Sequence, residues 1–88
     1  MKQITIDCIG MTTPDEVHDR FAQALDFPDW YGRNLDALYD MLSTCSELEL
    51  TLDNAWAIDK MFRYGDNLKL ALDDAAKDNP FFTVVYRQ

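Results

Sequence analysis

The sequence predicts an α/β fold in which a small three-stranded parallel sheet packs with four helices in the order β-α-α-β-α-α-β. Residues 3–9, 48–52 and 81–86 have the apolar and β-branched composition of strands. Between successive strands lie two segments with apolar residues at helical spacing. Strands joined by helical crossovers pair in parallel with right-handed connections. A chain of 88 residues has room for one such domain, spanning residues 1–88, and the strand order is not readable from the sequence.

The first strand and the first helix have clear local signals. Residues 3–9 alternate, so Ile4, Ile6 and Cys8 are expected to point inward. The run Thr13-Pro14-Asp15-Glu16 then combines an N-cap, a proline at the first helical position and a glutamate at the third. This capping box predicts a helix whose apolar face consists of Val17, Phe21, Ala24 and Leu25.

Residues 27–43 form the segment around which the rest of the chain is organised. Pro28 is expected to end the first helix, and Gly32 to supply the backbone freedom of a loop. Asn34 is expected to cap a second helix that runs to about Ser43. At about 100° per residue, one stripe of this helix faces the core and consists of Leu35, Leu38 and Leu42. Another face, expected to be exposed, carries Asp36, Tyr39, Asp40 and Ser43.

The second half of the chain predicts two more helices and the last strand. Residues 55–63 are expected to form a short helix that Gly65 closes in the C′ position. A fourth helix is indicated by the spacing of Leu68, Ala71, Leu72 and Ala75, and Asn79-Pro80 ends it. Residues 81–86 are β-branched and aromatic almost throughout, so they are expected to be the best-buried strand.

The charge of the chain is strongly acidic and unevenly distributed. The chain has 16 acidic and 8 basic side chains, for a net charge of −8. Seven of the acids lie within residues 26–53, where only Arg33 opposes them, so this segment carries −6 and the other 60 residues carry −2. Binding to nucleic acid depends on Lys and Arg, so the acidity argues against that function and favours a basic protein partner.

Other classes of function lack their sequence signals. Cys8 and Cys45 have neither CxxC spacing nor neighbouring histidines, so reduced thiols are expected, with no metal and no cofactor. There is no cleavable leader and no apolar run near 18 residues, so we expect a cytoplasmic protein without membrane contact. His18 is expected to be a half-exposed structural residue, and Asp73 to pair with Lys77 at i,i+4.

Asp36 and Asp40 differ in what their helix position explains. A carboxylate in the first turn, such as Asp36, gains about 0.3 to 1 kcal/mol from the helix dipole. Asp40 lies mid-helix, where aspartate has poor propensity and where it repels Asp36 by about 0.2 to 0.5 kcal/mol. A locally unfavourable residue on an exposed face is typical of a functional site.

Trp30 and Tyr31 precede this face directly. One of them is expected to cover part of the core, and together with an acidic surface they match the composition of protein-binding hot spots. The enzyme hypothesis would make Asp36 and Asp40 a metal site or an acid–base dyad. A convex helix face offers no desolvated cleft, and no His cluster, phosphate loop or nucleophile motif accompanies the two carboxylates. A binding protein is therefore favoured over an enzyme.

The run Pro28-Asp29-Trp30-Tyr31-Gly32-Arg33-Asn34-Leu35-Asp36-Ala37-Leu38-Tyr39-Asp40 resembles the barstar family of bacterial ribonuclease inhibitors. The pattern is an aromatic pair, then Gly-x-Asn-Leu-Asp-Ala-Leu, an aromatic residue and Asp. The resemblance implies the same β-α-α-β-α-α-β fold. It also implies an immunity-type inhibitor that binds a basic, extracellular-type ribonuclease one to one and is monomeric when free.

The resemblance further implies which residues bind the partner. Asp40 takes the central place, where a substrate phosphate would lie. The flanking positions are Trp30, Tyr31, Gly32, Asn34, Asp36, Tyr39 and, on the fourth helix, Asp74. Ser43 lies on the same face of the second helix as Asp36 and Asp40.

The chain departs from the family pattern at three places. Arg33 puts a positive charge in the acidic segment where the family has glutamate. Ser43-Thr44-Cys45 replaces Thr-Gly-Trp, and Asp74 is one methylene shorter than the glutamate it replaces. An alternative hypothesis therefore stands beside inhibition, in which an acidic interaction module of this fold binds a different basic partner without inhibiting a nuclease.

Overall fold

The computed structural model describes residues 2–88, and its strands form one parallel sheet. The sheet order is β1-β2-β3, so β2 is the central strand, which the sequence alone did not predict. The predicted element order is confirmed. The strands are β1 (Lys2–Asp7), β2 (Leu48–Asp53) and β3 (Phe82–Arg87).

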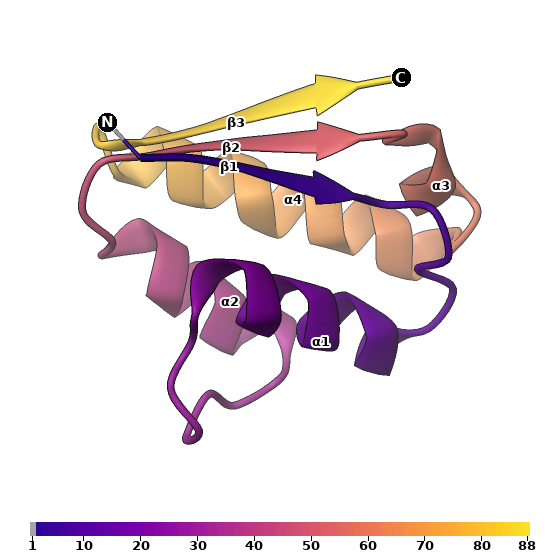
Figure 1. Ribbon diagram of the computed structural model, residues 1–88, viewed down its shortest axis with the longest axis horizontal. Helices are drawn as coiled ribbons and strands as arrows, with labels where there is room; N and C mark the ends of the chain where they lie inside the picture. Colours follow the sequence, from indigo (N-terminus) through magenta and orange to yellow (C-terminus); the bar gives the residue numbers. More distant parts are fainter. Residues whose placement is uncertain (1) are drawn as a thin grey trace.

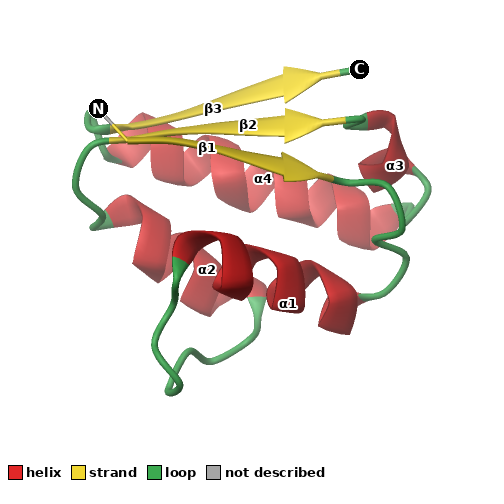
Figure 2. Ribbon diagram, in the orientation of Figure 1, coloured by secondary structure: helices red, strands yellow, loops and turns green. Residues whose placement is uncertain are grey.

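The helices lie on one face of this sheet (Figure 1; Figure 2). They are α1 (Pro14–Leu25), α2 (Leu35–Ser43), α3 (Trp56–Asp59) and α4 (Arg63–Asp78). α1 packs on β1, α4 packs on β3, and α2 lies along α4. The short α3 follows the carboxyl end of β2 (Figure 1). The segment that joins α1 to α2 hangs below the helices, on the side away from the sheet (Figure 1).

The sheet has a buried face and an open face. In β2, Leu48, Leu50 and Leu52 are buried among the helices, and the residues between them are half-exposed. Their register partners on β1 include Ile4 and Ile6, which continue the apolar face. The open face is polar, and Arg87 donates to the Asp53 carboxylate there at 2.5 Å. Because only one face is covered, the molecule has two layers.

β3 is not the best-buried strand, so that prediction is wrong. Its residues alternate between the helical face and solvent, and Val85 is 41% exposed. Phe82, Val84 and Tyr86 face the helices, and the alternate positions are Thr83, Val85 and Arg87, of which only Val85 is apolar. β3 is an edge strand with helices on one side only, so its outward row, Val85 included, faces solvent.

The start of α1 confirms the predicted cap, with one difference. The Thr13 hydroxyl accepts from the backbone N–H of Glu16 at 3.3 Å. The Glu16 carboxylate reaches back to the backbone N–H of Thr12 at 3.2 Å, rather than to that of Thr13. α1 ends at Leu25, followed by Asp26 in a left-handed conformation and then by Pro28.

The boundary between α3 and α4 differs from the prediction. α3 ends at Asp59, Phe62 forms the turn with a positive φ of 53°, and α4 already begins at Arg63. Gly65 therefore lies inside α4 and does not close α3. A Cβ at Gly65 would lie 2.0 Å from the carbonyl oxygen of Ile58, so the glycine is there for a close helix approach. The sequence pattern could not distinguish this use of glycine from a helix end.

A predicted ion pair on α4 is also absent. Within residues 2–88, Asp73 and Lys77 do not pair. Instead, the hydroxyl of Tyr86 donates to the Asp73 carboxylate at 2.8 Å. The Tyr86 ring packs against α4, and its hydroxyl group forms a hydrogen bond with Asp73 of that helix, so Asp73 links α4 to β3.

No helix in the described part of the chain is long and apolar enough to cross a membrane.

Candidate functional site

The candidate site begins where the loop ends at the start of α2. The Asn34 side chain accepts from the backbone N–H of Ala37 at 2.8 Å, so the predicted N-cap is confirmed. Arg33, and not Gly32, takes the left-handed conformation in this loop, with φ at 55°. At Gly32 a Cβ would lie 3.1 Å from that of Ala37, so the absence of a side chain lets the loop pass close to α2. Gly32 and Asn34 are both exposed.

Two carboxylates and a tyrosine share the outer face of α2, as the helical spacing predicts. Asp36 and Asp40 are exposed, and Tyr39 between them is half-buried. The Asp40 carboxylate accepts no hydrogen bond within residues 2–88. Its backbone carbonyl accepts from the hydroxyls of Ser43 at 3.4 Å and Thr44 at 2.8 Å, which end the helix. The Ser43 side chain is thus half-buried and turned to its own helix.

α4 adds further acidic groups to the same face. A shallow groove of about 340 Å³ runs between α2 and α4, lined by Leu35, Asp36, Tyr39, Asn67, Leu70, Ala71 and Asp74. The structure thus brings Asp74 beside Asp36 and Tyr39, although about 35 residues separate them in sequence. The residues Asp36, Tyr39, Asp40, Asp74 and Asp78 are called the acidic face below.

Tyr39 is held in place by the surrounding carboxylates. Its hydroxyl donates to the carboxylate of Asp78. This hydrogen bond raises the pKa of Tyr39 above its usual range, and partial desolvation and the charges of Asp78, Asp74 and Asp40 add to the effect. Tyr39 therefore stays protonated, with its ring edge fixed between α2 and α4. From the sequence, Asp78 was not predicted as part of this face, although Asp78 lies one helical turn after Asp74.

Trp30 and Tyr31 are neighbours in sequence but differ sharply in burial. The Trp30 side chain is 78% exposed, whereas Tyr31 is 6% exposed. The Tyr31 ring packs 4.7 Å from that of Phe27, and burial raises the pKa of its hydroxyl. The sequence predicted that one of the pair covers the core, and that residue is Tyr31. Because the Tyr31 side chain is buried, a partner cannot contact it directly, and Tyr31 is not part of the proposed contact surface.

A buried histidine holds Tyr31. His18 of α1 is 1% exposed, so the prediction of a half-exposed residue is wrong. Its Nδ1 lies 2.7 Å from the Tyr31 hydroxyl, and its Nε2 lies 2.8 Å from the Tyr64 hydroxyl. Burial lowers the pKa of His18, and the nearby Arg33 charge lowers it further. The neutral ring donates one hydrogen bond and accepts the other, and so links α1, the loop and α4.

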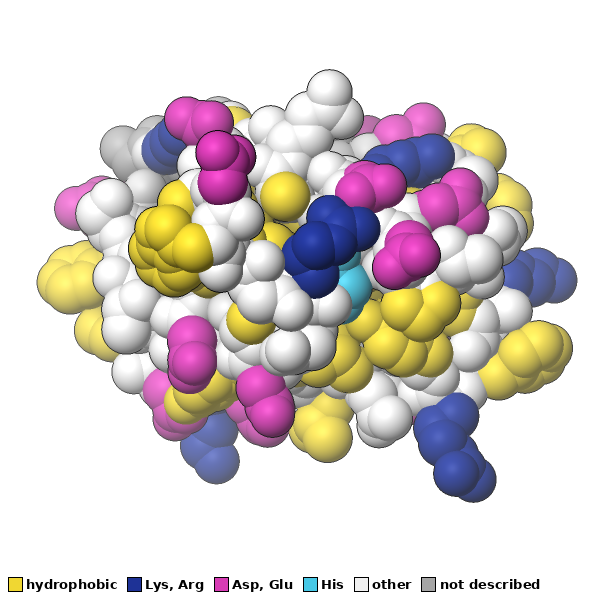
Figure 3. Space-filling model, turned by 90° about the horizontal axis from the view of Figure 1, so that it is seen from below, with side chains coloured by type: hydrophobic (Ala, Val, Ile, Leu, Met, Phe, Trp, Pro, Cys, Tyr) yellow, Lys and Arg dark blue, Asp and Glu magenta, His cyan; other side chains and the backbone are white. Residues whose placement is uncertain are grey.

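Arg33 does not neutralise the acidic face. Its guanidinium pairs with the Asp19 carboxylate of α1 at 2.8 Å and donates to the carbonyl of Asp15 at 3.3 Å. From the sequence, this positive charge was expected inside the acidic segment. In the structure, Arg33 has a left-handed backbone conformation and its side chain contacts α1. On the helical side of the molecule, acidic side chains lie beside exposed hydrophobic ones (Figure 3).

The far end of α2 is fixed by a residue that the sequence indicated only as a helix stop. Asn79 is 4% exposed, and its side-chain amide donates to the carbonyls of Leu42 at 2.9 Å and Cys45 at 3.1 Å. Both thiols are free, with Cys8 buried and Cys45 half-buried. α2 is thus held by Asn34 at one end and by Asn79 at the other, which makes the acidic face a rigid surface.

The family follows from a match over nearly the whole chain. Residues 1–86 match the family described as Barstar (barnase inhibitor). The chain belongs to the barstar family. The resemblance predicted from residues 28–40 is confirmed. A Bacillus subtilis (strain 168) protein named "Putative ribonuclease inhibitor YrdF" is 48% identical over 52 residues. The aligned segment is 59% of this chain and 57% of that protein, so this similarity spans little more than half of each.

Proposed function

We propose that this barstar-family protein inhibits a small basic ribonuclease by covering its active-site cleft with the acidic face, Trp30 and the loop before α2. The observation that carries the proposal is the group of carboxylates from α2 and α4 around the fixed ring of Tyr39. The family description and the name of the Bacillus subtilis relative support the same role.

The chemistry of a ribonuclease cleft suits this surface. The cleft is cationic because it binds a phosphodiester, and the exposed Asp40 carboxylate, free of hydrogen bonds within residues 2–88, can occupy a phosphate position. Asp36 and Asp74 flank it and can meet cationic groups at the cleft rim. Gly32 and Asn34 give the partner access to the backbone at the start of α2, and Trp30 offers an aromatic surface. Trp and Tyr beside charged groups are typical of binding hot spots.

The proposal is tested by titrating the protein into a ribonuclease assay with barnase as the enzyme. Activity is expected to fall linearly to zero at one equivalent, as for a tight one-to-one complex. Asp40→Asn is expected to need a large excess for the same effect. The matched control is Glu49→Gln, which removes the same charge from the open face of the sheet and should inhibit like the parent. Unchanged activity at micromolar protein would refute inhibition and leave a binding module for another basic partner.

The proposal includes that the protein is not itself an enzyme and that it acts in the cytoplasm, where an inhibitor protects the RNA of the cell. The family description as an inhibitor supports the first point. Incubation with esters, phosphodiesters and RNA, with and without divalent metal, is expected to give no turnover. Turnover that Asp40→Ala abolishes would contradict the assignment.

A further inference from the structure

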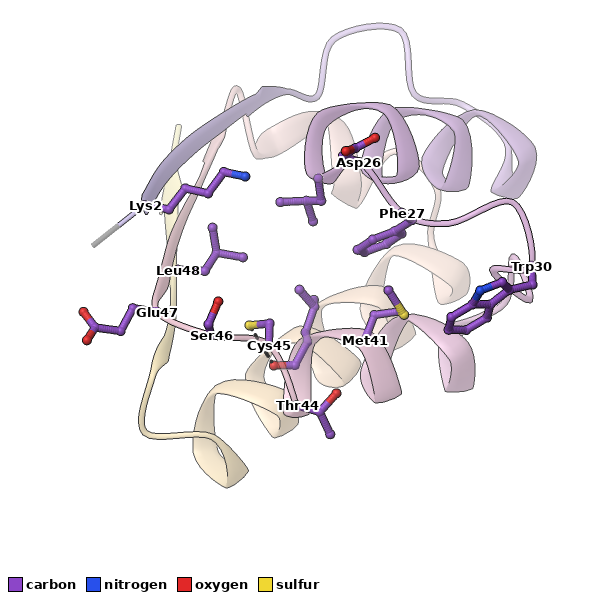
Figure 4. A pocket seen from close by; sticks show the side chains of 12 residues that line it. Lys2, Asp26, Phe27, Trp30, Met41, Thr44, Cys45, Ser46, Glu47 and Leu48 are labelled. Atoms are coloured by element: carbon purple, nitrogen blue, oxygen red, sulfur yellow. Dashed lines mark hydrogen bonds between the residues drawn. The ribbon is translucent and has the colours of Figure 1, made fainter.

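A second hollow lies on the other side of α2 from the groove between α2 and α4. It measures about 440 Å³ and lies between the end of α1, the loop, the end of α2 and the start of β2 (Figure 4). Its lining is mainly apolar, with Phe27, Trp30 and Met41 along one side and Leu48 and Cys45 along the other (Figure 4). We call it the Trp30–Met41 groove.

The rim of the groove is acidic. Asp26 and Glu47 line it, and neither forms an ion pair within residues 2–88. Lys2 is the basic residue of the lining, at the end near β1 (Figure 4). An apolar floor with unpaired carboxylates at the rim suits an apolar side chain whose sequence neighbours are cationic.

The groove is continuous with the acidic face. Trp30 forms a wall of the groove and is 78% exposed, and the loop that carries it runs straight into α2. Met41 follows Asp40 directly in the sequence, so a partner docked on Asp40 reaches the groove around one side of the same helix. Met41 has a flexible thioether side chain, which adapts to the shape of an occupant.

We propose that the Trp30–Met41 groove receives an aromatic or long aliphatic side chain of the basic protein that binds the acidic face, one flanked by Lys or Arg. The inference rests on the proposed function for the identity of that partner. The volume of about 440 Å³ is within the roughly 300 to 1,000 Å³ of pockets that hold drug-sized ligands, so one large side chain has room there. Asp40 then provides electrostatic attraction, and the groove discriminates among basic partners by the apolar side chain they present.

A peptide experiment tests the groove without any nuclease. The probes are acetyl-Arg-Phe-Lys-amide and acetyl-Arg-Gly-Lys-amide, titrated into the ¹⁵N,¹³C-labelled protein. The phenylalanine peptide is expected to shift the Trp30 indole and Met41 methyl signals at least severalfold more than the glycine peptide does. Equal shifts with both peptides, or shifts confined to the acidic face, would overturn the inference. Shifts of the groove signals with protein concentration alone would assign the groove to a second copy of this chain and also overturn it.

Barnase binding provides the second test. Met41→Ala is expected to weaken binding by roughly tenfold because it removes an apolar wall, and Met41→Leu should stay near the parent. Phe62→Ala is the control, since it removes an 80% exposed aromatic ring at the opposite end of the sheet. Thermal melts confirm that each variant is folded. If barnase binds and Met41→Ala binds like the parent, the inference fails and the proposed function stands. If barnase does not bind, the proposed function fails and the peptides alone decide the groove.

Discussion

Replacing Asp40 separates binding from folding on one helix face. In the free protein, the Asp40 carboxylate is exposed and accepts no hydrogen bond within residues 2–88, so its removal costs the fold nothing. Alanine improves the mid-helix propensity by about 0.5 to 0.7 kcal/mol. It also relieves the repulsion from Asp36 by about 0.2 to 0.5 kcal/mol. Asp40→Ala should therefore stabilise the free protein by about 0.7 to 1.2 kcal/mol, which is a Tm increase of roughly 3 to 10 °C for a domain of this size.

The same substitution should damage binding. In the proposed complex, the carboxylate is desolvated against several cationic donors, and removing it leaves those donors unpaired. The expected loss is at least about 2 kcal/mol, or roughly thirtyfold in Kd. Calorimetric titration of barnase measures the loss, and a thermal melt of the free variant measures the stability. Asp36→Ala is the comparison, because it loses a first-turn dipole interaction and should be the less stable of the two variants.

Two results would show that Asp40 does not have this role. A lower Tm for Asp40→Ala would mean that the carboxylate supports the fold. Binding as tight as that of the parent would mean that Asp40 lies outside the interface.

Three further predictions test other parts of the structure. Because burial lowers the folded-state pKa of His18 below its unfolded value near 6.5, the stability it contributes is complete above pH 6.5. That stability should fall, by at most about 1.4 kcal/mol per pH unit, as the pH drops toward the folded pKa, and urea unfolding of His18→Phe should lose this slope. Gly65→Ala should destabilise the protein by more than about 2 kcal/mol, because a Cβ would lie 2.0 Å from the Ile58 carbonyl oxygen; a variant as stable as the parent in urea would contradict this. Association with barnase, followed by stopped-flow fluorescence, should slow markedly between low and high salt because the acidic face steers the encounter, and a salt-independent rate would mean that this face is not the contact surface.

The elements of the fold could be predicted from the sequence because their signals are local. Thr13 and Asn34 mark helix starts through hydrogen bonds to nearby backbone groups, and the capped helices begin where these residues indicate. The roles of Gly65 and β3 could not be predicted because they depend on contacts distant in sequence. Gly65 is required by the carbonyl of Ile58, and the exposure of β3 depends on how many faces of the sheet the helices cover.

The candidate site was predictable to a similar extent. The spacing of Asp36 and Asp40 predicted their common face, because helical periodicity alone determines it. The direction of the Arg33 side chain and the burial of His18 were not predictable. Each depends on a partner from another element, Asp19 for the arginine and the hydroxyls of Tyr31 and Tyr64 for the histidine.

If the acidic face occupies the substrate site of a ribonuclease, as we propose, a nucleotide bound in that site must compete with this protein for the enzyme. Binding of this protein to barnase would be measured at increasing concentrations of a mononucleotide that fills the enzyme's active site. The apparent Kd is expected to rise in proportion to nucleotide concentration, because both ligands use the same cationic groups. Tight binding with an apparent Kd independent of nucleotide would contradict it, since the protein would then bind outside the cleft.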